Sequence, residues 1–130
     1  MIDYPQVALD FMNRDHAEFI ALRDKLLVLL EQQAPDSDVD AVLNQLLEHT
    51  HHHFGEEERA MQEAQFPPYP MHKMEHDQVL EDMQNRVAQW QQQRDASVLK
   101  NYLEKTLIDW FTRHVGMMDF VTARYISERH

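Results

Sequence analysis

Cysteine is absent from the 130 residues of this chain, which excludes disulfides, thiolate-bound zinc, iron–sulfur clusters and thiol catalysis. Glycine occurs only twice and proline five times, whereas sheet proteins need many glycine-dependent turns. Basic residues are also few, because 23 Asp and Glu outnumber 12 Lys and Arg and give a net charge of -11. Such a surface repels nucleic acids and anionic lipids. These absences favour an all-α protein with no nucleic-acid partner, in which any metal is held by His, Asp or Glu.

Long apolar runs are missing as well, since the longest extends only from Leu26 to Leu30, far short of a membrane span. The start of the chain carries Asp3, Asp10 and Asp15 instead of the basic stretch that opens a signal peptide. The length suits one domain with a core and is too short for two ordinary ones. We therefore expect one domain over residues 1–130 in a cytoplasmic protein with no membrane partner, and a monomer because like charges oppose association.

Apolar residues recur every three or four positions along most of the chain, a spacing typical of amphipathic helices. Polar or proline-containing breaks interrupt this pattern at residues 34–37, 66–70 and 91–97. The stretches between them cover about 7–33, Val39 to Ala64, about 70–93 and about 96–127. Helices of this length with short connections predict an antiparallel up-down-up-down four-helix bundle.

The expected helix boundaries follow from residues that begin helices. Asp36 or Ser37 is the expected N-cap of the second helix, and Asp95 or Ser97 that of the fourth. Pro70 stands at the expected start of the third helix, where its missing N–H costs nothing.

Histidine is unusually frequent, with nine in the chain, and several histidines fall on the apolar stripes that should face the core. His53 with Glu57, and His72 with His76, are four residues apart, so each pair points the same way one turn apart. The polar residues on the stripes are His16, His53, Glu57, His72, His76 and His114. Burying them without partners would cost several kcal/mol. A metal site between the helices removes this cost, and five imidazoles with carboxylates fit two ions better than one tetrahedral zinc.

A second bridging carboxylate is expected from the fourth helix. Asp119 is the candidate, although it follows His114 by five residues and therefore lies about 140° further around an α-helix. Gly116 stands between the two and would permit a local distortion that brings them onto one face.

Three segments resemble the motifs of the hemerythrin family. They are His53-Phe54-Gly55-Glu56-Glu57, the His72–His76 pair, and the segment from Trp110-Phe111 through His114-Val115 to Asp119. With His16 they fill all seven ligand positions of the family pattern in order, over most of the chain. The resemblance implies a di-iron site in the core of a four-helix bundle, which binds dioxygen when both irons are ferrous.

The resemblance also implies a role for each residue. His72, His76 and His114 would hold one iron, and His16 and His53 the other. Glu57 and Asp119 would bridge two non-haem iron ions (Fe2+/Fe3+), together with a solvent-derived oxo or hydroxo group. The iron with two histidines would keep an open position for O2, inside an apolar pocket. The expected function is reversible O2 binding for storage, delivery or sensing, and a sensor would need a separate, unidentified protein partner.

Two departures from the family pattern concern the O2 pocket. Members with a longer N-terminal arm have a Trp there and an Asp three residues before the first-helix histidine, but this chain has no early Trp and has Asn13 at that place. Phe111 is aromatic where oxygen carriers often have an aliphatic side chain. Both departures bear on the volume of the pocket and on the lifetime of bound O2.

Other functions are compatible with some of the same residues. The same centre could be an enzyme acting on peroxide, nitric oxide or ferrous iron, or a structural metal site with no exchangeable position. Ferritin-like oxidases rank lower, because their sites are rich in carboxylates with Glu-x-x-His pairs. The His76-Asp77 dipeptide of metal-dependent phosphohydrolases ranks lower too, since the chain is short for that fold.

A run of histidines precedes His53, and these residues have no assigned role. His52 with Glu56 has ligand spacing but points about 100° away from the apolar stripe, which favours a solvent-exposed face. His49 lies one turn before His53 and could support it from outside the ligand set. His51 has neither feature.

Overall fold

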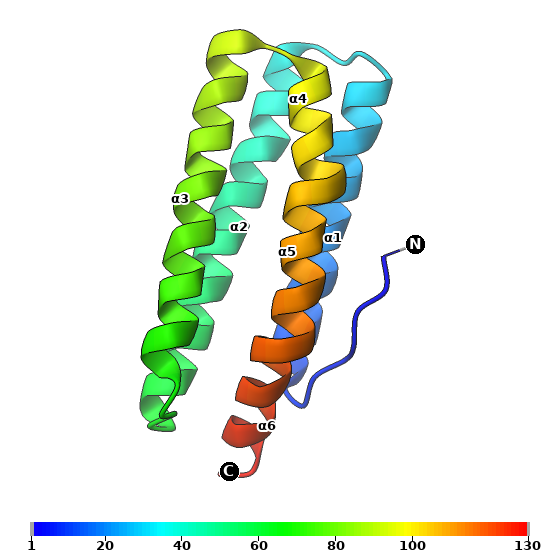
Figure 1. Ribbon diagram of the computed structural model, residues 1–130. Coiled ribbons are helices and arrows are strands. Elements are labelled where there is room, and N and C mark those ends of the chain that lie inside the picture. Colours follow the sequence, from blue (N-terminus) through cyan, green and yellow to red (C-terminus); the bar gives the residue numbers. More distant parts are fainter. Residues whose placement is uncertain (1, 130) are drawn as a thin grey trace.

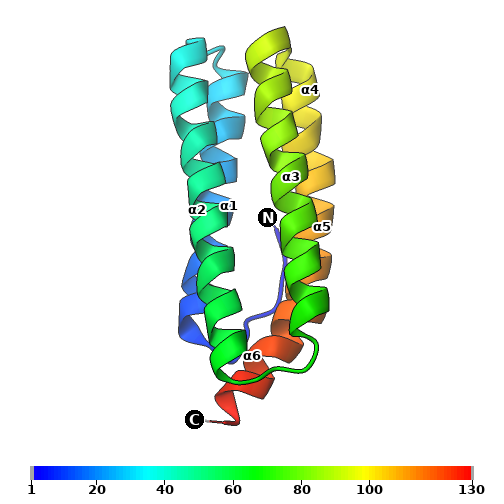
Figure 2. The same cartoon turned by 90° about the vertical axis from the view of Figure 1, so that its left-hand side faces the viewer.

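The computed structural model describes residues 2–129 and is an antiparallel bundle of four helical rods (Figure 1). The rods are α1 (Asp10–Glu31), α2 (Asp36–Glu63), α3 (Tyr69–Gln93) and a fourth rod that runs from α4 to α6. Figure 2 shows the rods standing side by side, with α1 and α2 on one side and α3 and the fourth rod on the other. The chain reverses direction at each connection, which confirms the predicted all-α up-down-up-down bundle. None of the described helices is long and apolar enough to cross a membrane.

The fourth rod is not a uniform α-helix. It consists of α4 (Ala96–Asn101), the π-helical turn η1 (Tyr102–Thr106), α5 (Leu107–His114), the π-helical turn η2 (Val115–Asp119) and α6 (Phe120–Ser127). In a π-helical turn each N–H bonds to the carbonyl five residues earlier instead of four, so the turn is wider and the side chains that follow are rotated.

The helix starts agree with the expected boundaries in two of three cases. The Asp95 carboxylate accepts the backbone N–H of Ser97 and caps α4, and Pro70 lies in the first turn of α3. The expected cap of α2 is wrong, because Pro35 is its N-cap residue and Asp36 is already helical. Proline offers no side-chain acceptor, so the acidic first turn stabilises this end through the helix dipole instead.

The helices end without glycine. Gln33, Gln65 and Arg94 follow α1, α2 and α3 and adopt positive φ angles of 54°, 54° and 50°. Such left-handed residues close a helix by turning the chain away from its axis. Glycine is the usual choice there because it has no Cβ, so the scarcity of glycine does not prevent sharp connections.

The leucine-rich part of the apolar core occupies the half of the bundle where α1 ends and α2 begins. Its centre is formed by Leu26, Leu43, Leu46, Leu103 and Leu107, none more than 1% exposed. Each rod except α3 contributes a leucine to this layer, and α3 supplies methionine, valine and tryptophan at the corresponding positions. Burial of these side chains stabilises the bundle independently of any metal.

The residues before α1 form an arm that lies along the bundle (Figure 1). Asn13 holds it in place, because its side-chain oxygen accepts the N–H of Val7 at 2.8 Å and its amide donates to the Val7 carbonyl at 2.9 Å. Tyr4 on this arm packs edge-on against Phe111 at 5.2 Å and against His16 at 6.1 Å. The arm thus covers the interior with a tyrosine, and Asn13 anchors it.

Candidate metal centre

The half of the bundle opposite the leucine layer is built around polar side chains. All seven residues singled out from the sequence lie there, and none is more than 7% exposed. His16 comes from α1, the pair His53 and Glu57 from α2, the pair His72 and His76 from α3, and His114 and Asp119 from α5 and η2. The structure therefore brings together every predicted site residue, with contributions from all four rods.

One group of ligand atoms comes from α2, α3 and the fourth rod. It consists of Glu57, His72, His76, His114 and Asp119, each with one atom within 4.8 Å of the others. His72 Nε2 lies 3.1 Å from His114 Nε2, and both nitrogens lie 3.1 Å from Asp119 Oδ1. His76 Nε2 lies 3.2 Å from Glu57 Oε1. Three imidazole nitrogens and two carboxylates therefore converge on one point.

A second group shares both carboxylates with the first. It consists of His16, His53, Glu57 and Asp119, again within 4.8 Å of one another. His16 Nε2 lies 2.8 Å from Asp119 Oδ2, and His53 Nε2 lies 2.8 Å from Glu57 Oε2. Each carboxylate thus directs one oxygen toward each group, which is the arrangement that two bridged ions require.

The η2 turn explains how Asp119 reaches the same face as His114. In a regular α-helix five residues leave the two side chains about 140° apart. The wider π-helical turn over Val115–Asp119 absorbs part of this rotation, and Asp119 Oδ1 approaches His114 Nε2 to 3.1 Å. The local distortion expected around Gly116 is therefore present. Turns of this kind are often found at functional sites.

The imidazoles of the larger group, and that of His53, each form a hydrogen bond through Nδ1, the ring nitrogen that points away from the ligand groups. His53 Nδ1 lies 2.7 Å from Asp15, His76 Nδ1 3.0 Å from Glu58, and His114 Nδ1 2.7 Å from Glu75. His72 Nδ1 lies 2.9 Å from the hydroxyl of Thr122.

The partners of the Nδ1 atoms decide where the ring protons sit. A carboxylate can only accept a hydrogen bond, so Nδ1 of His53, His76 and His114 carries the proton. The neutral form of each ring then presents the Nε2 lone pair to the interior, as a metal ligand does. The supporting carboxylates were not predicted from the sequence. Asp15, Glu58 and Glu75 each stand next to a predicted ligand in the chain, and this adjacency is the signal that could have revealed them.

Aromatic rings hold two imidazoles in orientation. Phe54 stacks on His76 with ring centres 3.8 Å apart, and Trp110 stacks on His114 with centres 4.6 Å apart. These contacts restrict ring rotation, so the Nε2 atoms stay directed at the interior.

Electrostatics within the cluster couple its acids and bases. Burial works against the charged form of His53, but the charge of Glu57 at 2.8 Å and the hydrogen bond to Asp15 outweigh it and raise the pKa of His53 to about 10. Burial likewise opposes charge on His114, and Asp119 with Glu75 raises its pKa to about 9. Burial and the charge of Asp119 push the pKa of Glu57 upward, but His53 and His76 lower it to about 2.

The paired charges leave several buried atoms without a hydrogen-bond partner. They are both carboxylate oxygens of Glu57, Oδ1 of Asp119, Nε2 of His76 and Nδ1 of His16. Unpaired polar atoms at this depth are costly. Most of them face the interior of the two groups, and imidazole with carboxylate is a donor set that suits iron. The residues present therefore fit a pair of bound metal cations.

Comparison with known proteins agrees with this chemistry. The sequence model of the family described as "Hemerythrin HHE cation binding domain" matches residues 7–126. The chain belongs to the hemerythrin family. It is accordingly a non-haem iron-binding protein of the hemerythrin type.

Hemerythrin relatives cover nearly the whole chain. The bacteriohemerythrin of Aquifex aeolicus is 29% identical over 118 residues, which span 91% of this chain and 89% of the relative. The bacteriohemerythrin of Ralstonia nicotianae is 30% identical over 118 residues, spanning 88% and 79%. That of Campylobacter jejuni is 20% identical over 120 residues, spanning 92% and 89%.

Beside the smaller ligand group of this hemerythrin lies a small cavity of about 10 Å³. Both imidazoles of the smaller group, His16 and His53, line it, with only His114 from the imidazoles of the larger group. The shared Asp119 and the rings of Phe19 and Phe111 line it as well. Phe111 stacks on Phe19 at 4.8 Å and meets His16 edge-on at 5.6 Å. Phe111, with Tyr4 packed behind it, therefore limits the space at this end of the centre, and the cavity is at the lower limit for one water-sized molecule.

The remaining histidines of α2 lie outside both groups. His49 is half-buried, with its Nε2 3.1 Å from the Asp15 carbonyl and its ring parallel to that of His53 at 6.4 Å. His51 and His52 are exposed, and His52 pairs only with Glu56 at 3.5 Å. His49 thus supports the α1–α2 contact beside His53, and His52 faces solvent as expected.

Proposed function

We propose that this chain binds O2 reversibly at a non-haem di-iron centre, for storage, delivery or sensing. The observation that carries the proposal is the unequal division of the imidazoles. Three belong to one ligand group and two to the other, while Glu57 and Asp119 belong to both. The group with fewer imidazoles lies beside the small cavity, so its ion would have room for an exchangeable ligand.

In this proposal His72, His76 and His114 would hold one iron, and His16 and His53 would hold the other. Glu57 and Asp119, which belong to both groups, would serve both ions. Iron that cycles between Fe2+ and Fe3+ supplies the electrons that O2 binding requires. Both oxygens of Glu57 and Oδ1 of Asp119 support this assignment, because they are buried and receive no hydrogen bond.

The side chains around the cavity would control what reaches the centre. Phe19, Phe111 and Val115 present carbon to the space beside His16 and His53, which disfavours water and leaves room for a small apolar molecule. Asp15 keeps the ring of His53 in the orientation that faces the centre.

The proposal treats residues 1–130 as one domain that acts in the cytoplasm as a monomer. The net charge of -11 supports independence from nucleic acids. A role in sensing would need a protein partner that reads the bound state.

The experiment is an absorption titration with O2. The iron-loaded protein is reduced under argon, exposed to O2 and returned to argon while its visible spectrum is recorded. We expect a ligand-to-iron absorption band that appears with O2 and disappears under argon. A Glu56→Gln variant, which changes a half-buried carboxylate that pairs with Arg59 and belongs to neither ligand group, should behave in the same way.

The other outcomes point to other functions. A band that decays to an oxidised state without reversal would favour an enzyme acting on peroxide, nitric oxide or ferrous iron. A spectrum that does not respond to O2 or to added azide would indicate a structural metal site with no exchangeable position. Failure to retain iron would contradict the di-iron assignment itself.

A further inference from the structure

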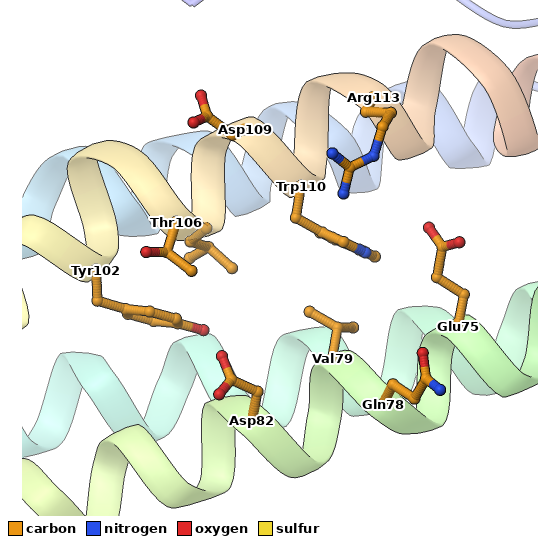
Figure 3. Close-up of a pocket in the computed structure, with 10 residues that line it drawn as sticks. Glu75, Gln78, Val79, Asp82, Tyr102, Thr106, Asp109, Trp110 and Arg113 are labelled. Atoms are coloured by element: carbon orange, nitrogen blue, oxygen red, sulfur yellow. The ribbon is translucent and has the colours of Figure 1, made fainter.

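The largest cavity described is a groove of about 430 Å³ on the outside of the bundle, and none of the seven metal ligands lines it. Figure 3 shows that α3 forms one wall and the segment from η1 to α5 forms the other. Its volume is in the range of small-molecule sites. The O2-binding proposal makes no use of this groove.

Carboxylates mark two separate places along the α3 wall. Glu75 and Asp82 both line the groove and are seven residues apart, so they stand two helical turns, or about 10 Å, from each other. Between them Val79, together with Leu107 and Trp110 from the facing wall, gives the groove an apolar middle. The groove therefore has a carboxylate near each end and apolar side chains between them.

A buried hydroxyl without a partner lies beside Asp82. Tyr102 is only 2% exposed, and its hydroxyl oxygen makes no hydrogen bond. Figure 3 shows the hydroxyl directed into the groove on the side where the Asp82 carboxylate lies. Burial raises the pKa of Tyr102, so the neutral hydroxyl can accept a hydrogen bond from a cation. An unsatisfied group of this kind costs free energy, and a bound polar group would remove that cost.

The charges around the groove favour a cation. Arg113 is the one basic side chain among the described residues that line it, against the carboxylates of Glu75, Asp82 and Asp109. Arg86 Nε lies 3.7 Å from Oδ1 of Asp82, and its guanidinium lies over the Tyr102 ring at 5.2 Å. At that distance the ion pair with Asp82 is weak, and a bound ammonium group would compete with Arg86 for the carboxylate. The other oxygen of Asp82 is free to bind a ligand.

We propose that the groove binds a linear aliphatic polyamine, with one ammonium group between Asp82 and Tyr102 and a second at Glu75. The carbon chain would lie on Val79, Leu107 and Trp110. An ammonium group donates several hydrogen bonds, which suits a carboxylate beside an accepting hydroxyl. Glu75 also accepts the Nδ1–H of His114 at 2.7 Å, so a ligand in the groove shares this carboxylate with the metal centre.

Calorimetric titration of the iron-loaded protein with spermidine, in about 0.15 M salt, tests the proposal. An Asp82→Asn variant should weaken binding about tenfold, because it removes a charge-assisted contact. A matched Glu81→Gln variant removes one carboxylate from the neighbouring, exposed position on the same helix. It should leave the affinity within about twofold. n-Pentylamine, which has a single ammonium group, should bind more weakly than spermidine.

A Tyr102→Phe variant separates binding from stability. We expect weaker spermidine binding together with an unchanged or raised free energy of unfolding, because the variant loses an unsatisfied buried hydroxyl. Equal losses of affinity in Asp82→Asn and Glu81→Gln would show diffuse attraction to the acidic surface and overturn the proposal. Absence of spermidine binding to the unaltered protein would overturn it as well. Neither result depends on whether the iron centre binds O2.

Discussion

The two halves of the bundle are built from the same four rods but differ in the side chains that face inward. In the half where α1 ends and α2 begins, the inward positions hold Leu26, Leu43 and Leu103. In the other half, the inward positions of the same rods hold His16, His53 and His114. The inward residues of α1, α2 and α3 keep helical spacing through both halves, so there only the chemistry of the side chains changes. In the fourth rod the η2 turn alters the spacing as well.

The apolar half allows the chain to bury polar side chains whose burial costs free energy. Burial of the leucine layer stabilises the helices whether or not a metal is bound. The polar half contains unpartnered buried atoms on Glu57, Asp119 and His76, each of which costs free energy until it gains a partner. One half therefore maintains the geometry that the other half needs for binding.

The largest expected effect is loss of iron from the polar half. His114→Ala removes a ligand that converges with His72 and Asp119, so the variant should lose iron while its circular dichroism stays helical. Elemental analysis of the purified variant measures the iron per chain. Retention of both irons would contradict the proposed ligand assignment and the comparison on which it rests.

The matching change in the apolar half should lower stability without loss of iron. Leu103→Ala empties a fully buried position and should lower the free energy of unfolding of the metal-free protein by about 3 kcal/mol. Iron loading should be kept. Denaturant unfolding measures the effect, with Val28→Ala, at a site 48% exposed, as the control. A loss of iron without a loss of stability would mean that the two halves are not divided in this way.

An intermediate effect on iron affinity is expected from the carboxylates that hydrogen-bond the ligand histidines. Asp15→Asn weakens the hydrogen bond at 2.7 Å that orients His53, and iron affinity should fall about 10-fold to 100-fold. Competition with a chelator measures the affinity. Glu48→Gln, on the exposed face of α2, provides the control. If both variants bind iron equally well, the support through Nδ1 has no influence on the centre.

The smallest effect is expected in the histidine run of α2. His52→Ala changes an exposed side chain and should alter the free energy of unfolding by less than about 0.5 kcal/mol, with iron content unchanged. His53→Ala, one residue further along, should lose iron. Equal behaviour of the two variants in elemental analysis would remove the distinction between the buried and the exposed faces of this helix.

Much of the fold follows from the sequence because helical periodicity is a local property. The breaks at residues 34–37 and 66–70 separate rods whose bounds lie close to the expected ones, and Asp95 caps the last rod as predicted. The predicted N-cap of α2 is wrong. Several acidic or hydroxyl residues follow Pro35 and could each begin a helix, and only the backbone conformation makes Pro35 the N-cap.

The sequence by itself determined which side chains face inward, since positions three and four apart share one face of a helix. It thus predicted that His16, His53 and His72 would be buried with carboxylates nearby. Tertiary structure decided the rest. The η2 turn brought Asp119 onto the face of His114, and packing between rods placed Asp15 behind His53 and Tyr102 beside Asp82. Periodicity orients side chains within one helix, whereas contacts between helices depend on axial offsets and rotations that no local pattern contains.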